Sequence, residues 1–104
     1  MSPAQHTSIT ILEEQGGFSL EDLCRACAAH ADLVAELVEE AVIVPVGHAR
    51  HEWRFTGVHL RHARVAVRLH QDLGVNAVGA ALALQLMDEL DRLRAQVQRL
   101  GGHP

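Results

Sequence analysis

Two cysteines and several histidines are the residues of this 104-residue chain whose types could bind a metal ion. Cys24 and Cys27 have a C-x2-C spacing, His30 follows three residues later, and His48 and His51 would complete a two-cysteine, two-histidine site. The spacing fits poorly, because the linker is longer than in a zinc finger and the histidine pair is closer. We therefore predict that both thiols are core groups and that no metal is bound. A metal-responsive sensor is the weaker alternative.

The eight histidines do not form a catalytic arrangement. His59 and His62 share a helix face, but no carboxylate stands there to orient a general base. The chain also lacks a nucleophile-elbow motif, a phosphate-binding loop and a dinucleotide fingerprint. The sequence thus predicts a protein that is not an enzyme and that needs no cofactor.

Cations are concentrated in residues 53–71, which contain no acid, while lysine is absent from the whole chain. The cations are Arg54, Arg61, Arg64 and Arg68. The last three form one stripe along a helix and could contact phosphates. Arginine stems also cover apolar surface and pair with acids such as Glu52 or Asp72. The net charge of −4 favours this second interpretation over nucleic-acid binding.

Residues 32–45 carry the opposite charge, although they occupy the place of a DNA-reading helix in a small winged-helix domain. Their acids are Asp32, Glu36, Glu39 and Glu40, and they contain no Lys, Arg or His. Affinity for a duplex comes mainly from cations that meet phosphates, so this helix should be repelled by DNA. A second acidic group consists of Asp88, Glu89 and Asp91. For each group the simpler alternative is a solvated helix face.

Local signals predict the elements that position these residues. Residues 8–11 alternate like a short strand, and Ser19 with Asp22 forms a capping pair that starts a first helix. The apolar face of that helix is Leu20, Leu23, Cys24, Cys27 and Ala31. Asp32 is the expected cap of a second helix, which would complete a helix-turn-helix core. Its inward stripe is Leu33, Leu37, Val38 and Ala41.

A two-stranded wing is expected next. Residues 42–44 are β-branched and are stopped by Pro45, and residues 51–55 alternate, with Trp53 and Phe55 on the same side. The wing would lead directly into a third helix.

That third helix is expected to run from a cap at Thr56 to about Leu73, where Gly74 is a natural stop. Asn76 can cap a fourth and longer helix. Its apolar residues follow 4-3-4-3 spacing, typical of a coiled-coil seam, at Leu86, Leu90, Leu93, Val97 and Leu100. Exposed leucine stripes are rare on monomers, so we predict a homodimer through this seam. The alternative is packing against the chain's own third helix.

The order of elements resembles the MerR-type winged fold. The chain departs from true MerR regulators, which carry an Arg-Tyr-Tyr-like element in the second helix and an arginine-rich wing with a tyrosine. Here the second helix reads LVAELVEEA and tyrosine is absent. The resemblance implies a mainly α fold: a winged helix-turn-helix with a two- or three-stranded wing and a long C-terminal helix. Residues 1–104 would form one such domain, with residues 76–100 as the terminal helix.

The chain resembles the chaperone-modulator family, CbpM, more closely. The resemblance rests on the helix pair ending in VIVP, on WRF at 53–55, on AVRLHQDLGV at 66–75, and above all on GAALALQLMDELDRLRAQVQRL at 79–100. It implies a relative of MerR domains that does not bind DNA. Such a protein would bind the J-domain of a DnaJ-like co-chaperone, CbpA, and restrain the work of that co-chaperone with DnaK.

The resemblance also suggests a contact surface. J-domains expose a basic helix that engages Hsp70, and an acidic helical surface could cover it. Because LMDEL belongs to the recognisable segment, Asp88, Glu89 and Asp91 are favoured over Glu36, Glu39 and Glu40. The rival hypothesis is a MerR-like transcription regulator that uses its arginines on phosphates.

The expected compartment is the cytoplasm. No apolar run in the chain is long enough to cross a bilayer, and the first ten residues lack a signal-peptide pattern. We therefore expect no membrane among the partners of the protein. The acidic residues 32–45 and the negative net charge lead us to expect no direct nucleic-acid partner.

Overall fold

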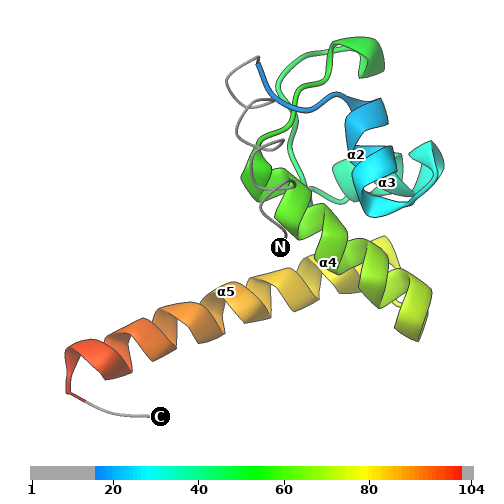
Figure 1. The fold of residues 1–104 in the computed structure, drawn as a ribbon. Coiled ribbons are helices and arrows are strands. Elements are labelled where there is room, and N and C mark those ends of the chain that lie inside the picture. Colours follow the sequence, from blue (N-terminus) through cyan, green and yellow to red (C-terminus); the bar gives the residue numbers. More distant parts are fainter. Residues whose placement is uncertain (1–15, 102–104) are drawn as a thin grey trace.

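The computed structural model describes residues 16–101 (Figure 1). Within this range the helices are α2 (Leu20–Cys27), α3 (Ala31–Glu39), the 3-10 helix η1 (Arg50–Glu52), α4 (Gly57–Leu73) and α5 (Ala77–Arg99). Helix α4 contacts α2, α3 and α5, and the second half of α5 projects beyond the other helices. The prediction of a mainly α fold with a long C-terminal helix is confirmed. The strand predicted at residues 8–11 lies outside the described residues.

Three of the four α-helices begin at the predicted caps. Ser19 accepts a hydrogen bond from the Asp22 amide at 3.1 Å, and the Asp22 carboxylate accepts one from the Ser19 amide at 2.9 Å. Thr56 starts α4, and the Asn76 side chain accepts from the Gly79 amide at 2.8 Å to start α5. These bonds satisfy amide groups that the first helical turn leaves without partners.

The start and the buried face of α3 differ from the prediction. His30, and not Asp32, occupies the N-cap position, and Asp32 lies in the first turn, where a carboxylate suits the positive end of the helix. Of the predicted inward stripe, Leu37 is buried and Ala41 is exposed, because the chain leaves the helix at Glu40 and Ala41 has a φ of +57°. Leu33 and Val38 are half-buried, and the buried residues of α3 are Val34, Ala35 and Leu37.

The predicted two-stranded wing is not seen as strands within residues 16–101. Two isolated antiparallel bridges stand in its place, Phe18 with Phe55 and Val46 with Arg54. Each bridge has two backbone hydrogen bonds of 2.8–3.0 Å. Part of the expected second strand forms η1 instead.

Two residues of the expected first strand of the wing, Val42 and Ile43, belong to the hydrophobic core instead. Val42 and Ile43 are buried, and the Val42 amide donates to the Leu37 carbonyl at 2.9 Å, so the chain is still tied to the end of α3. Burying both neighbouring side chains excludes the alternation between two faces that a half-buried strand requires. The β-branched pattern at these positions therefore reflects burial.

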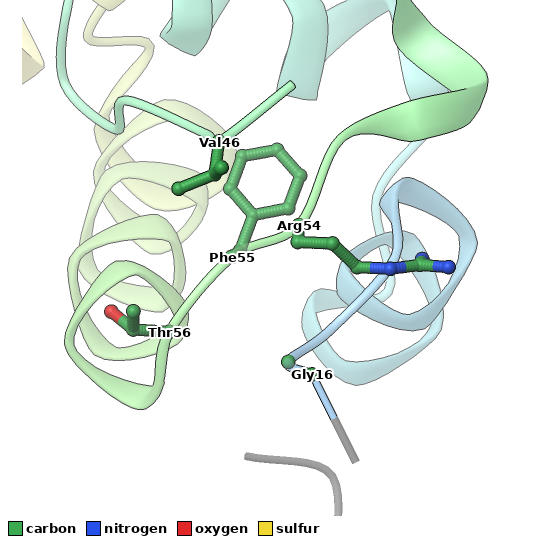
Figure 2. Close-up of a pocket in the computed structure, with 6 residues that line it drawn as sticks. Gly16, Val46, Arg54, Phe55 and Thr56 are labelled. Carbon is green, nitrogen blue, oxygen red and sulfur yellow. The ribbon is translucent and has the colours of Figure 1, made fainter. Parts of the chain in front are cut away.

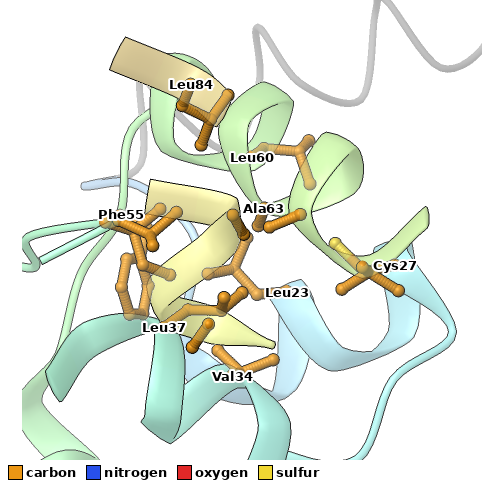
Figure 3. Packing of buried hydrophobic residues seen from close by; sticks show 14 of the residues in the cluster. Leu23, Cys27, Val34, Leu37, Phe55, Leu60, Ala63 and Leu84 are labelled. Atoms are coloured by element: carbon orange, nitrogen blue, oxygen red, sulfur yellow. The ribbon is translucent and has the colours of Figure 1, made fainter. Parts of the chain in front are cut away.

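One hydrophobic core joins all four α-helices (Figure 3). Its largest fully buried side chains are Phe55, Leu23, Leu37, Ile43, Leu60, Val34 and Val67. Small residues on α4 and α5, such as Ala63 and Ala80, are also buried and allow close helix packing. No described residue contributes a buried polar or charged side chain. None of the helices within residues 16–101 combines the length and apolarity needed to cross a membrane.

Candidate interaction surfaces

Helix α5 has two apolar sides. Ala77, Ala80 and Leu84 are buried against the rest of the fold. Leu82 and Leu86 stand two residues from Leu84, which is about 200° around a helix, and so they point nearly the opposite way. Both are 57% exposed. The helix therefore packs on the core through one side and presents a second apolar side to solvent.

The five predicted seam residues all belong to this outer side. They are between 48% and 87% exposed, as Leu86, Leu90, Leu93, Val97 and Leu100. The alternative in which the seam packs on α4 is therefore wrong. The structure extends the stripe toward the start of α5 by Leu82 and Val78, which is 59% exposed. Leu82 precedes Leu86 by four residues and Val78 precedes Leu82 by four more, a signal in the sequence that the predicted seam did not include.

The acidic residues of α5 lie mostly on the other side. Asp88 and Asp91 follow the buried Leu84 by four and seven residues and so continue its helix face beyond the core. Both are exposed, and neither forms an ion pair with another residue of the range 16–101. Glu89 is different, because Arg92 holds its carboxylate at 2.6 Å. Two of the three predicted acids are thus unpaired.

The acidic residues of α3 meet the beginning of α5. Glu36, Glu39 and Glu40 line a hollow of about 250 Å³ together with Asn76, Ala77 and Val78. The N-terminus of a helix carries partial positive charge, so carboxylates beside it are favoured. The three exposed acids of α3 thus lie beside the start of α5.

The four arginines are arranged differently from a phosphate-binding stripe. Arg68 approaches Asp72 at 4.0 Å, which is the pairing that the sequence suggested. Glu52 has His51 as its partner at 3.6 Å instead of an arginine. Arg64 is half-buried and acts electrostatically on Cys27, whereas Arg54 and Arg61 are exposed.

Cys24 and Cys27 pack with the core, as predicted, and Cys27 is 9% exposed. Burial raises the pKa of both thiols, and at Cys27 the nearby Arg64 opposes the rise. A raised pKa disfavours the thiolate that binds metals. The histidines predicted as alternative ligands do not join the cysteines: the described part of the chain holds no group of His, Cys, Asp and Glu arranged for a metal ion.

A separate open hollow of about 470 Å³ lies where the two backbone bridges meet (Figure 2). Its lining is Gly16, Gly17, Val46, Arg54, Phe55 and Thr56. The guanidinium of Arg54 is the single ionisable group among these six residues. The hollow thus offers no acid–base pair for catalysis.

Comparison with known proteins identifies the family. Residues 18–101 match the family described as "MerR HTH family regulatory protein". The "Chaperone modulatory protein CbpM" of Pseudomonas putida (strain W619) is 38% identical over 86 residues, which cover 79% of this chain and 85% of the relative. The chain belongs to the CbpM family. The CbpM of Coxiella burnetii (strain Dugway 5J108-111) is 30% identical over 90 residues, covering 86% of this chain and 85% of the relative.

Membership of the CbpM family agrees with the resemblance that the sequence suggested. The family is regulatory and not enzymatic, so the prediction that the chain is not an enzyme is confirmed. No solved structure matches this CbpM-family chain significantly.

Proposed function

We propose that the protein binds the J-domain of a DnaJ- or CbpA-like co-chaperone and inhibits the stimulation of DnaK (Hsp70) by that co-chaperone. The observation that carries the proposal is the pair Asp88 and Asp91, exposed on a projecting helix and in no ion pair with another residue of the range 16–101, in a chain whose relatives are named chaperone modulatory proteins. A basic helix of a J-domain is complementary to such a surface. The mechanism is occlusion: while this protein covers the J-domain, DnaK cannot reach it.

The acids of α5 are a better contact surface than those of α3. Glu36, Glu39 and Glu40 already lie beside the N-terminus of α5, where their charge is partly compensated. Asp88 and Asp91 have no such neighbour within the described residues, and they belong to the stretch 85–101, in which every residue is exposed. Glu89 would contribute less, because Arg92 must release its carboxylate first.

We further propose that the protein is a homodimer through Leu86, Leu90, Leu93, Val97 and Leu100. A second copy would cover an apolar stripe that is costly to leave in water. Since the stripe and the pair Asp88 and Asp91 occupy nearly opposite sides of α5, a dimer leaves the acids free for the J-domain.

The rival function, a DNA-binding regulator, has less support. Its reading helix would be α3, whose exposed polar side chains are carboxylates that repel phosphates. Of the four arginines, Arg68 is already near Asp72 and Arg64 is half-buried. Specific binding to genomic fragments in a gel-shift experiment would favour the rival.

A titration into a DnaK ATPase assay, stimulated by the J-domain protein, tests the proposal. The natural protein should abolish the stimulation, and the double variant Asp88→Lys, Asp91→Lys should lose most of this inhibition. The matched control is Glu36→Lys, Glu39→Lys, which reverses the same amount of charge on α3 and should still inhibit. Circular dichroism checks that both variants fold.

The outcomes distinguish an error in the proposed contact surface from an error in the proposed function. If both double variants inhibit like the natural protein, the acids are not the contact surface. If the natural protein leaves the ATPase stimulated at saturating concentration, J-domain inhibition itself is refuted.

A further inference from the structure

The N-terminus of α4 is closed by a reciprocal cap that uses a histidine. The Thr56 hydroxyl accepts a hydrogen bond from the His59 amide at 3.4 Å, and the Thr56 amide donates to Nδ1 of His59 at 3.1 Å. Glutamate or glutamine usually fills the position of His59 in such a capping box. An amide can only donate, so Nδ1 must be unprotonated and the neutral ring must carry its proton on Nε2.

We propose that this cap is an acid-sensitive latch: protonation of His59 removes the hydrogen bond to the Thr56 amide and loosens the start of α4. A charged imidazole has donors on both nitrogens and cannot accept from Thr56. It also places positive charge at the positive end of the helix dipole. Both effects arise when the neutral ring of His59 takes up a proton.

The surroundings of His59 support the same direction. The imidazole is half-buried, and its ring meets the buried Phe55 edge to face, with centroids 6.0 Å apart. Burial, with a smaller contribution from His62, lowers the pKa of His59. Among the residues that the structure describes, no acid opposes this lowering of the pKa of His59.

The sign of the pH dependence follows from this lowered pKa. Above the ordinary histidine value of about 6.5 the ring is neutral in both folded and unfolded chains, and the cap is intact. As the pH falls below that value, the unfolded chain takes up the proton first, so the folded state loses stability. The loss stops growing once the pH is below the pKa of the folded state.

The latch is connected to a long-range contact. Phe55 directly precedes Thr56, and its backbone exchanges two hydrogen bonds of 2.8 Å with Phe18. Loosening the cap therefore releases Thr56, the residue that joins the bridge between Phe18 and Phe55 to α4. At the other end of α4, His70 Nδ1 lies 3.2 Å from the Val75 carbonyl, which can only accept. The ring nitrogen of His70 thus faces an acceptor, whereas that of His59 faces a donor.

Amide hydrogen exchange in the full chain at pH 7.5 and pH 5.5, corrected for intrinsic rates, tests the latch. The Thr56 amide of the natural protein should lose protection by about five-fold at pH 5.5, the factor that corresponds to about 1 kcal/mol for a lost cap. His59→Gln retains an acceptor that does not titrate, and its Thr56 protection should stay constant. His62→Gln removes a neighbouring histidine that does not cap, so its Thr56 amide should still lose protection at pH 5.5.

Two outcomes would overturn the proposal: equal protection at both pH values in the natural protein, or an equal loss in His59→Gln. A second measurement does not need variants. The ring nitrogen shifts of His59 at pH 7.5 should show Nε2–H, and a proton on Nδ1 would equally refute the latch.

Discussion

Gly17 lies where two backbone segments approach too closely for any larger residue. Its φ is +98°, and a Cβ atom would stand 2.6 Å from the Phe55 carbonyl oxygen. That oxygen accepts the hydrogen bond from Phe18, so it cannot move aside without breaking the bridge. The neighbouring Gly16 has a similar φ of +100° but open space around it.

This pair of glycines gives a matched stability prediction. Gly17→Ala should destabilise the fold by more than Gly16→Ala, because both variants strain the backbone by about 1–3 kcal/mol but only the first also clashes. Each kcal/mol lowers the Tm of a domain of this size by about 4–8 °C. Thermal unfolding followed by circular dichroism compares the two. An equal Tm for both variants would show that the contact between Gly17 and Phe55 is not close.

Histidines at the two ends of α4 show how one residue type takes two roles. His59 accepts a backbone hydrogen bond at the start of the helix, whereas His70 lies opposite a carbonyl near its end. The cap at Thr56 is visible in the sequence, since threonine favours the N-cap. The partner role of His59 is less visible, because glutamate or glutamine is the usual signal at that position.

At the scale of an element, α5 combines two functions on one helix. Its first half is held in the core by Ala77, Ala80 and Leu84, and its second half has an apolar side and an acidic side. Most of the stability of a helix in a protein comes from packing, so a partner on the apolar stripe would also stabilise the projecting half of α5.

The apolar stripe leads to a prediction about association. Leu90→Glu, Leu93→Glu should convert the proposed dimer into a monomer, because two charges would be buried at the centre of its interface. Ala95→Glu is the control: it adds a charge on the opposite side of α5 and should leave the dimer intact. Sedimentation equilibrium measures both variants. A natural protein that stays monomeric at high concentration would rule out the dimer.

At the scale of the whole molecule, charge is divided between parts of the fold. Helix α3 carries acids and no cation, whereas the projecting half of α5 carries three acids together with Arg92, Arg94 and Arg99, and the exposed cations Arg54 and Arg61 lie before and within α4. The formal net charge is −4. In the proposed complex, exposed charges of this kind affect the association rate more than the affinity.

Partner binding should therefore weaken as salt rises. Between 0.05 and 0.5 M salt the affinity for the proposed J-domain partner should fall, mainly through a slower association rate. Salt screens the attraction between exposed charges, and the screening length is only about 10 Å at 0.1 M. Surface plasmon resonance across this range measures both rates. The neutral double variant Asp88→Asn, Asp91→Asn should remove most of the salt dependence. An affinity independent of salt would point to an apolar contact instead.

The sequence by itself determined the features that depend on neighbours within a few residues. The caps at Ser19, Thr56 and Asn76 and the helix stop at Gly74 are confirmed because each hydrogen bond joins residues close together in the chain. The leucine spacing of α5 was readable for the same reason, although Val78 and Leu82 were missed as its continuation.

The tertiary structure alone decided which faces are buried. Val42 and Ile43 satisfy the composition of a strand but fill the core, because the turn at Ala41 directs both inward. Asp88 and Asp91 read as one acidic group with Glu89, and the burial of Leu84 shows that these two aspartates continue the core-facing side of α5. Burial depends on contacts between residues far apart in the chain, so local spacing cannot fix it.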